Sequence, residues 1–346
     1  MVERALTVAH NGVGACEGFL AAPVRGSEAG VLVLAGSSGR IEDERCRILA
    51  RAGLTALSVR WFGGPGQPPG ICEVPLETFE SATGLLRSRG AQRIGVLGTS
   101  KGAEAALHLS VLDLGVDAVV ALSPTSLTWA NVGPGRDGRT RPYRSSWTWR
   151  GEALPFVPYD DSWTPTGAEG APVSVLGWYE RSRHTFADRV GAAAIPVERS
   201  AADLLLVAGA DDAMWPSLRS AEELAARRRA AGRPVRLIAR ADGGHRPRFP
   251  ERARRRSPTG SCTAVRPSPM RHSALLPGRT YSMYCGGLAA PEPAGPLAVA
   301  DFSSPSSKRG SGPESQLPGL QPSAFITSLD RRRSHPAAED QERRNA

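Results

Sequence analysis

Short runs of apolar residues alternate along the chain with longer segments in which apolar residues recur every three or four positions. The apolar runs predict strands over residues 30–36, 54–61, 93–98, 117–124, 202–209 and 235–241. The amphipathic segments predict helices over residues 41–53, 76–90, 102–112 and 217–232. Continuously apolar strands separated by helices are typical of a mostly parallel sheet with helices on both faces. We therefore expect one α/β domain over residues 1–251, with an antiparallel strand pair at its edge formed by the first residues of the chain.

One long segment interrupts this alternation within the domain. Residues 125–200 connect two predicted strands and contain five of the seven tryptophans: Trp129, Trp147, Trp149, Trp163 and Trp178. A connection of this length inside a compact domain is usually functional, so we expect a lid or a wall of a substrate site. The alternative is an irregular surface excursion held in place by aromatic packing.

A second segment, residues 252–346, has a different composition. It begins with "RARRRSPTGSC", is rich in Pro, Ser, Gly and Arg, and has no strand or helix period. This composition predicts a disordered tail. It is also what GC-rich coding DNA yields when it is read in a shifted frame. We therefore hypothesise that the tail is a frameshift product or an unrelated extension.

Charge and cysteine content restrict the possible partners. The formal net charge is +9, but 14 Lys and Arg against 7 Asp and Glu place +7 of it from Arg252 onward, which leaves +2 for the preceding residues. This distribution does not favour nucleic acid as a partner of the domain. The five cysteines are scattered without a CxxC spacing, so we expect neither a metal site nor a disulfide framework, and no cofactor.

The N-terminal residues lack the basic start and apolar block of a signal peptide. No apolar run has the length of a membrane span. We expect a cytoplasmic protein with no membrane partner.

Residues 98–102, Gly-Thr-Ser-Lys-Gly, stand between a predicted strand and a predicted helix. A GxSxG sequence at such a turn is typical of a nucleophile elbow, in which the glycines allow a strained turn that exposes the serine. The following helix directs its positive N-terminal end at the site. Ser100 is therefore a candidate nucleophile, and the alternative is a loop of small residues.

A serine nucleophile needs a general base, and the base needs an orienting acid. Asp212 follows the strand at 202–209, and His245 follows the strand at 235–241. His245 would accept the serine proton and return it to the leaving group. The order Ser, Asp, His at three strand ends favours catalysis over an ordinary loop histidine. Asp211 is a rival for the acid, with helix capping as its alternative role.

Two backbone amides are candidates for an oxyanion hole. The amide of Lys101 follows the nucleophile, and the amide of Ser37 lies in the small-residue loop after the first parallel strand. The Lys101 side chain would meet an anionic substrate or form a surface salt bridge. We interpret His108, two turns into the predicted elbow helix, as a packing or surface residue.

The chain resembles the catalytic, C-terminal domain shared by acyl-CoA thioesterases and bile acid-CoA:amino acid N-acyltransferases. The resemblance covers roughly residues 15–250. It is carried by "GVLGTSKGAE", "YRSSWTWRGEALPFVP", "IPVERSAADLLLVAGADDAMWPS" and "GGHRPRFP". The "SKG" and "IPVER" segments are much more particular than GxSxG and separate this family from general esterases.

This resemblance implies an α/β-hydrolase fold and a triad of Ser100, Asp212 and His245 that acts on a CoA thioester. The acyl group passes to the serine, CoA leaves, and water or an amine takes the acyl group. Some members use a cysteine nucleophile, and a serine fits the hydrolytic branch better. We therefore expect an acyl-CoA thioesterase with acyl-CoA as substrate. The alternatives are an N-acyltransferase with the same intermediate, or a non-catalytic hydrolase fold whose basic tail binds RNA or acidic partners.

Three features depart from the family pattern. Only a short strand pair precedes the domain, where vertebrate members have a β-sandwich domain. The segment around "PGRDGRTRPYRSS" is longer, so acyl preference does not carry over. The helix that follows the catalytic histidine in the family is replaced here by the Pro/Arg/Ser-rich tail.

Overall fold

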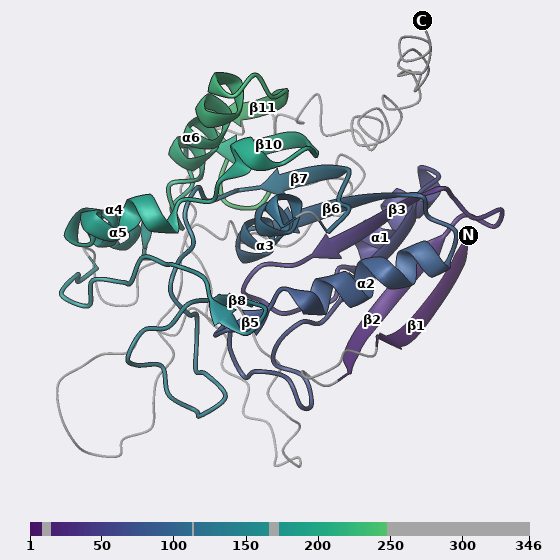
Figure 1. The fold of residues 1–346 in the computed structure, drawn as a ribbon, viewed down its shortest axis with the longest axis horizontal. Helices are drawn as coiled ribbons and strands as arrows, with labels where there is room; N and C mark the ends of the chain where they lie inside the picture. The colour runs from purple at the N-terminus through teal and green to yellow at the C-terminus, as the bar shows by residue number, and fades with distance from the viewer. Residues whose placement is uncertain (9–14, 113, 166–172, 248–346) are drawn as a thin grey trace, which may run out of the picture.

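An eight-stranded sheet forms the centre of the computed structural model, which describes residues 1–8, 15–112, 114–165 and 173–247 (Figure 1). The strand order is β1-β2-β4-β3-β6-β7-β10-β11. β1 pairs antiparallel with β2 and β2 with β4, and the remaining pairs are parallel. The strands are β1 (Val2–Val8), β2 (Cys16–Ala22), β3 (Ala29–Leu34), β4 (Thr55–Val59), β6 (Arg93–Thr99), β7 (Ala118–Leu122), β10 (Asp203–Gly209) and β11 (Val235–Arg240). The predicted parallel strands and the antiparallel edge are confirmed, with strand ends that differ by at most two residues.

Helices cover both faces of this sheet, as expected for an α/β-hydrolase fold. The helices against the sheet are α1 (Asp43–Arg51), α2 (Glu77–Ser88), α3 (Lys101–Val111) and α6 (Ser217–Ala230). Side chains alternate between the two faces along each strand. In β3, Leu32 and Leu34 therefore join the core formed with α2, α3 and α6, while Val31 and Val33 join the core formed with α1.

The elbow helix α3 lies deep in the molecule because its sequence is rich in alanine. Every residue from Lys101 to Ser110 is buried. The small side chains of Ala103, Ala105 and Ala106 allow the helix to approach β6 and β7 closely. This packing holds the N-terminal end of α3 at a constant place beside the carboxyl end of β6.

The long connection at 125–200 contains short elements that its sequence did not predict. They are β8 (Trp147–Trp149), β9 (Glu152–Ala153), α4 (Leu176–Thr185), α5 (Ala187–Ala193) and the 3-10 turn η1 (Val197–Arg199). β8 pairs with β9 and with β5 (Val74–Pro75) in a second, three-stranded sheet. Strands of two or three residues are too short to give a period that could be recognised in the sequence.

Aromatic side chains form the core of this connection. The ring of Trp129 stacks on Tyr159 with centroids 5.9 Å apart and meets Tyr179 edge-on at 4.8 Å. Tyr179 in turn contacts Trp215, which follows β10, at 5.7 Å. The connection is therefore joined to the main domain by packed rings, and its role as a lid remains a prediction.

The predicted tail and its boundary near Arg252 lie outside the described residues. Among the described helices, none combines the length and the apolar character needed to cross a membrane.

Candidate active site

Ser100 stands on a strained turn between β6 and α3. Its backbone has φ 56° and ψ −121°, a left-handed conformation that non-glycine residues rarely adopt. Its amide donates to the carbonyl of Leu122 at 2.9 Å, which ties the turn to β7. Backbone strain of this kind is maintained only where the surrounding structure holds it, and it is frequent at catalytic residues. The predicted elbow geometry is therefore present.

The two glycines of GxSxG are required by close packing of the backbone. A Cβ at Gly98 would collide with the Gly102 carbonyl group and would lie 2.6 Å from the Ala103 amide nitrogen. A Cβ at Gly102 would collide with the Ala35 carbonyl oxygen and lie 2.6 Å from that of Leu34. In both cases the obstacle is main chain, which cannot move without displacing the elbow.

Replacement of Gly98 by alanine should therefore destabilise the fold by at least about 1–3 kcal/mol, the usual cost of overpacking. Gly84 in α2 is the matched control, because a Cβ there meets nothing within 4 Å. Gly84→Ala should stabilise the protein by about 0.5–1 kcal/mol, since alanine is the better helix former. Urea unfolding of the two variants checks the opposite signs. Equal effects of the two changes would contradict the packing argument.

Asp212 and His245 meet beyond the carboxyl ends of β10 and β11. The His245 Nδ1 atom lies 2.9 Å from Asp212 Oδ2 and 3.1 Å from Oδ1, and both side chains are buried. When the imidazole donates from Nδ1 to the carboxylate, its Nε2 atom carries no proton and can accept one. Backbone amides of Met214 and Trp215 also donate to Asp212 Oδ1, at 2.9 and 3.3 Å.

The structure distinguishes the two candidate acids by position. Asp211 is exposed and makes no side-chain hydrogen bond to His245, whereas Asp212 is 3% exposed and makes two. The capping role considered for Asp211 is not seen, because α6 begins only at Ser217 and has no side-chain capping hydrogen bond. The geometry favours Asp212 as the orienting acid.

Two residues that the sequence did not single out hold the histidine loop. Ser123, at the end of β7, has a left-handed φ of 47° and donates its hydroxyl to the His245 carbonyl at 2.8 Å. The Trp215 indole donates to the Ser123 carbonyl at 3.1 Å, and its ring meets the imidazole edge-on at 5.7 Å. The only sequence signal was the place of Trp215, three residues after the acid.

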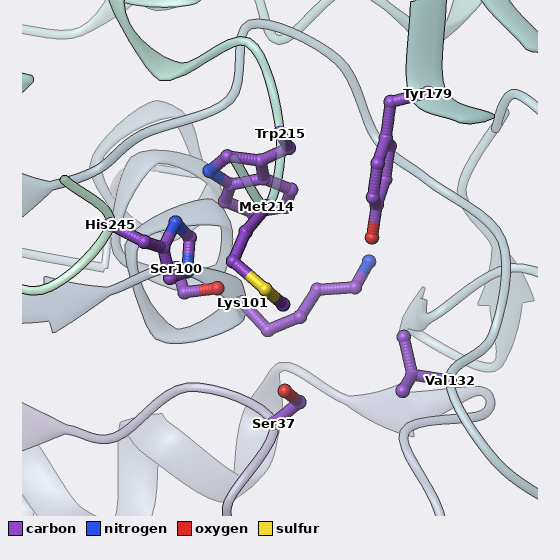
Figure 2. Close-up of a pocket in the computed structure, with 8 residues that line it drawn as sticks. All are labelled: Ser37, Ser100, Lys101, Val132, Tyr179, Met214, Trp215 and His245. Atoms are coloured by element: carbon purple, nitrogen blue, oxygen red, sulfur yellow. The ribbon is translucent and has the colours of Figure 1, made fainter. Parts of the chain in front are cut away.

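Ser100 and His245 line one pocket and lie next to each other in Figure 2. The pocket has a cavity volume of about 10 Å³ and is lined by Ser37, Ser100, Lys101, Val132, Tyr179, Met214, Trp215 and His245. The Ser100 hydroxyl has no hydrogen bond to any described residue. Catalytic contacts are often long without substrate and tighten when it binds. The arrangement is therefore compatible with proton transfer from the serine to the imidazole.

The candidate oxyanion donors flank the nucleophile. Gly36 packs against Ser100, since a Cβ at Gly36 would lie 3.0 Å from the Ser100 Cβ atom, and this brings the next residue, Ser37, to the pocket. Lys101 is the first residue of α3, so its amide has no acceptor within the helix. No described backbone carbonyl accepts from either amide. Both N–H groups therefore remain available to an oxyanion.

The Lys101 side chain forms an ion pair, but a buried one and not the surface pair considered above. Lys101 Nζ donates to Glu104 Oε2 and to Ser146 Oγ, both at 2.8 Å. The other carboxylate oxygen of Glu104 accepts from the Trp129 amide at 3.1 Å and the Trp147 indole at 2.9 Å. Burial lowers the pKa of Lys101 and raises the pKa of Glu104, and the ion pair opposes both shifts. Three donors directed at one carboxylate favour its ionised form.

His108 is a packing residue, as interpreted from the sequence. It is buried in α3, and its Nε2 atom lies 2.9 Å from the Thr128 hydroxyl. Burial, with a smaller contribution from the Lys101 charge, lowers the pKa of His108 to about 3. The imidazole is therefore neutral near pH 7.

A family model described as "BAAT / Acyl-CoA thioester hydrolase C terminal" matches residues 74–254, just over half of the chain. The chain belongs to this family. The match includes Ser100, Asp212 and His245.

Individual relatives of the family are similar at moderate identity. The mouse protein "Acyl-coenzyme A thioesterase 2, mitochondrial" is 28% identical over 214 residues, which are 61% of this chain and 43% of the relative. Mouse "Acyl-coenzyme A amino acid N-acyltransferase 1" is 28% identical over 229 residues, 64% of this chain and 49% of the relative. The chain thus spans about half the length of the curated relatives it matches.

Among solved structures, the acylaminoacyl peptidase of Pyrococcus horikoshii superposes with a TM-score of 0.49 at 13% identity, over 70% of this chain and 37% of that one.

Proposed function

We propose that this chain is an acyl-CoA thioesterase that hydrolyses its substrate through an acyl-enzyme on Ser100. The observation that supports the proposal best is the pocket shared by Ser100 and His245, with the imidazole hydrogen-bonded to the buried Asp212. The family match and the relatives named as acyl-coenzyme A thioesterases support the thioester as substrate.

In the first half of the reaction, Ser100 Oγ attacks the thioester carbonyl carbon while its proton passes to His245 Nε2. The amides of Ser37 and Lys101 donate to the developing oxyanion. Asp212 stabilises the imidazolium that forms. The carbon–sulfur bond then breaks, and the CoA thiolate leaves with the proton from His245.

In the second half, water attacks the ester carbon of the acyl-enzyme and gives its proton to His245. The second tetrahedral intermediate collapses, the free acid leaves, and the proton returns to Ser100 Oγ. A thioester is already activated toward attack, so positioning and oxyanion stabilisation are the main requirements.

A panel of acyl-CoAs tests the proposal. The purified chain is incubated with each thioester, and free thiol is followed with and without glycine or taurine. We expect thiol release in the absence of an acceptor, together with a transient mass increase equal to the acyl group on the peptide that contains Ser100. Absence of both signals in a folded sample would contradict the proposal and favour a non-catalytic hydrolase fold.

The second candidate is an N-acyltransferase, which is favoured by the similarity to mouse acyl-coenzyme A amino acid N-acyltransferase 1. The two activities share the acyl-enzyme and differ in whether water or an amine takes the acyl group. Thiol release that requires glycine or taurine, with formation of the amide, would support transfer.

A further inference from the structure

The Lys101 side chain lies in the pocket but has no part in the proposed hydrolysis. Its backbone amide is a candidate oxyanion donor, whereas the ammonium group is at the far end of a long side chain. Figure 2 shows this side chain running from Ser100 across the pocket, with its ammonium facing the Tyr179 hydroxyl. The wall of the pocket around this side chain also includes the apolar side chains of Val132, Met214 and Trp215.

The ammonium has one more donor than the protein uses. It carries three N–H groups, and the described residues accept two of them, through Glu104 Oε2 and Ser146 Oγ. The charge itself is already balanced by Glu104. What remains at this end of the pocket is a hydrogen-bond donor without excess positive charge.

A buried donor without an acceptor is costly, and hydrogen bonds to charged groups are stronger than those between neutral groups. A substrate oxygen at this position would accept from Lys101, whereas a methyl group would displace water from the donor and offer nothing in return. The pocket is also small: its cavity volume of about 10 Å³ is far below the usual range for ligand pockets. The donor of Lys101 restricts the chemistry of the acyl group, and the small pocket restricts its size. Neither restriction depends on the CoA part of the substrate.

We propose that the acyl group of the substrate is short and carries a neutral oxygen acceptor, a hydroxyl or keto group, a few carbons from the thioester, and that Lys101 binds this oxygen. Lys101 is then a specificity-determining residue. This inference rests on the proposed thioesterase function.

Two matched substrate pairs test the inference on the unmodified chain. 3-Hydroxybutyryl-CoA is compared with 3-methylbutyryl-CoA, and 4-oxopentanoyl-CoA with 4-methylpentanoyl-CoA, so that each pair differs by oxygen against methyl at nearly equal size. In at least one pair, kcat/KM from thiol release should be at least about tenfold higher for the oxygen-containing member. Equal or better hydrolysis of both methyl analogues would overturn the inference and leave the thioesterase proposal intact. No hydrolysis of any thioester would instead be a failure of the proposed function.

A double variant, Lys101→Met with Glu104→Gln, assigns the preference to the side chain. Lys101→Met alone would leave a buried unpaired carboxylate and is expected to fold poorly. In the double variant, the amide that replaces the Glu104 carboxylate keeps a carbonyl oxygen for the Trp129 and Trp147 donors, and neither charge remains. The ratio of kcat/KM within the preferred pair should fall to within about threefold of one.

Ser146→Ala is the matched control, because it removes one partner of Lys101 but keeps the ammonium. This variant should retain the preference for the oxygen-containing substrate. If Lys101 had a purely structural role, the double variant would have a lower kcat/KM for both members of a pair by the same factor. The ratio of kcat/KM within the pair would then be unchanged, and this result would contradict the inference. Circular dichroism melting confirms that each variant is folded.

Discussion

Replacement of Ser100 by alanine is expected to lower kcat for acyl-CoA hydrolysis by about 10⁶-fold, the size of effect seen when a serine nucleophile is lost. In the proposed mechanism, alanine removes the atom that bonds to the acyl carbon, while the pocket and the two candidate oxyanion amides remain. The residual hydrolysis should proceed by direct attack of water and show no acyl-enzyme. Steady-state thiol release and intact-protein mass spectrometry after rapid quenching provide the two measurements.

The control for this experiment is Ser88→Ala. Ser88 lies at the exposed end of α2 and donates only to the Leu85 carbonyl, at 2.8 Å. Its loss should leave kcat within about twofold, since surface substitutions usually change stability by less than about 0.5 kcal/mol. If the Ser100→Ala variant retained more than a tenth of the activity, the covalent mechanism would have to be abandoned.

Asp212→Asn should lower kcat by about 10⁴-fold, the size of effect seen when a triad acid is replaced by its amide. Asparagine can donate to Nδ1 and thereby stabilise the wrong imidazole tautomer, in which Nε2 carries the proton and cannot act as the base. Its amide also fails to stabilise the imidazolium. Initial rates at substrate concentrations below and above KM separate this loss from weaker binding.

The neighbouring residue offers a closely matched comparison. Asp211→Asn changes the same functional group one position earlier, but Asp211 is exposed and has no hydrogen bond to the imidazole. Its effect on kcat should be no more than a few-fold. A larger loss from Asp211→Asn than from Asp212→Asn would reverse the assignment that the geometry favours.

The central sheet could be predicted from the sequence because its strands are buried on both faces. All residues of β3, β4 and β7 are buried; β3 and β7 appear in the sequence as uninterrupted apolar runs, and β4 is apolar apart from Thr55 and Ser58. The long connection was less predictable. Its elements are short, and its stability comes from aromatic contacts such as Trp129 with Tyr179, which join positions far apart in the chain.

The candidate triad could be predicted for a related reason. In a parallel sheet, the segments that follow successive strands come together at one edge, so Ser100, Asp212 and His245 were expected at the same place. The supporting residues gave no comparable signal. Ser123 holds the histidine loop through a hydroxyl-to-carbonyl contact across 122 positions, and nothing in its neighbours indicates that role.

Apolar periodicity and the order of a few polar residues at strand ends were sufficient to establish the α/β class, the elbow and the family resemblance, because these features are local or follow from the topology of a parallel sheet. The choice between Asp211 and Asp212, the burial of the Lys101–Glu104 pair and the composition of the pocket wall depended on the folded chain. Each of these is set by which side chains meet across large sequence separations, and neighbouring residues in the sequence carry little information about such contacts.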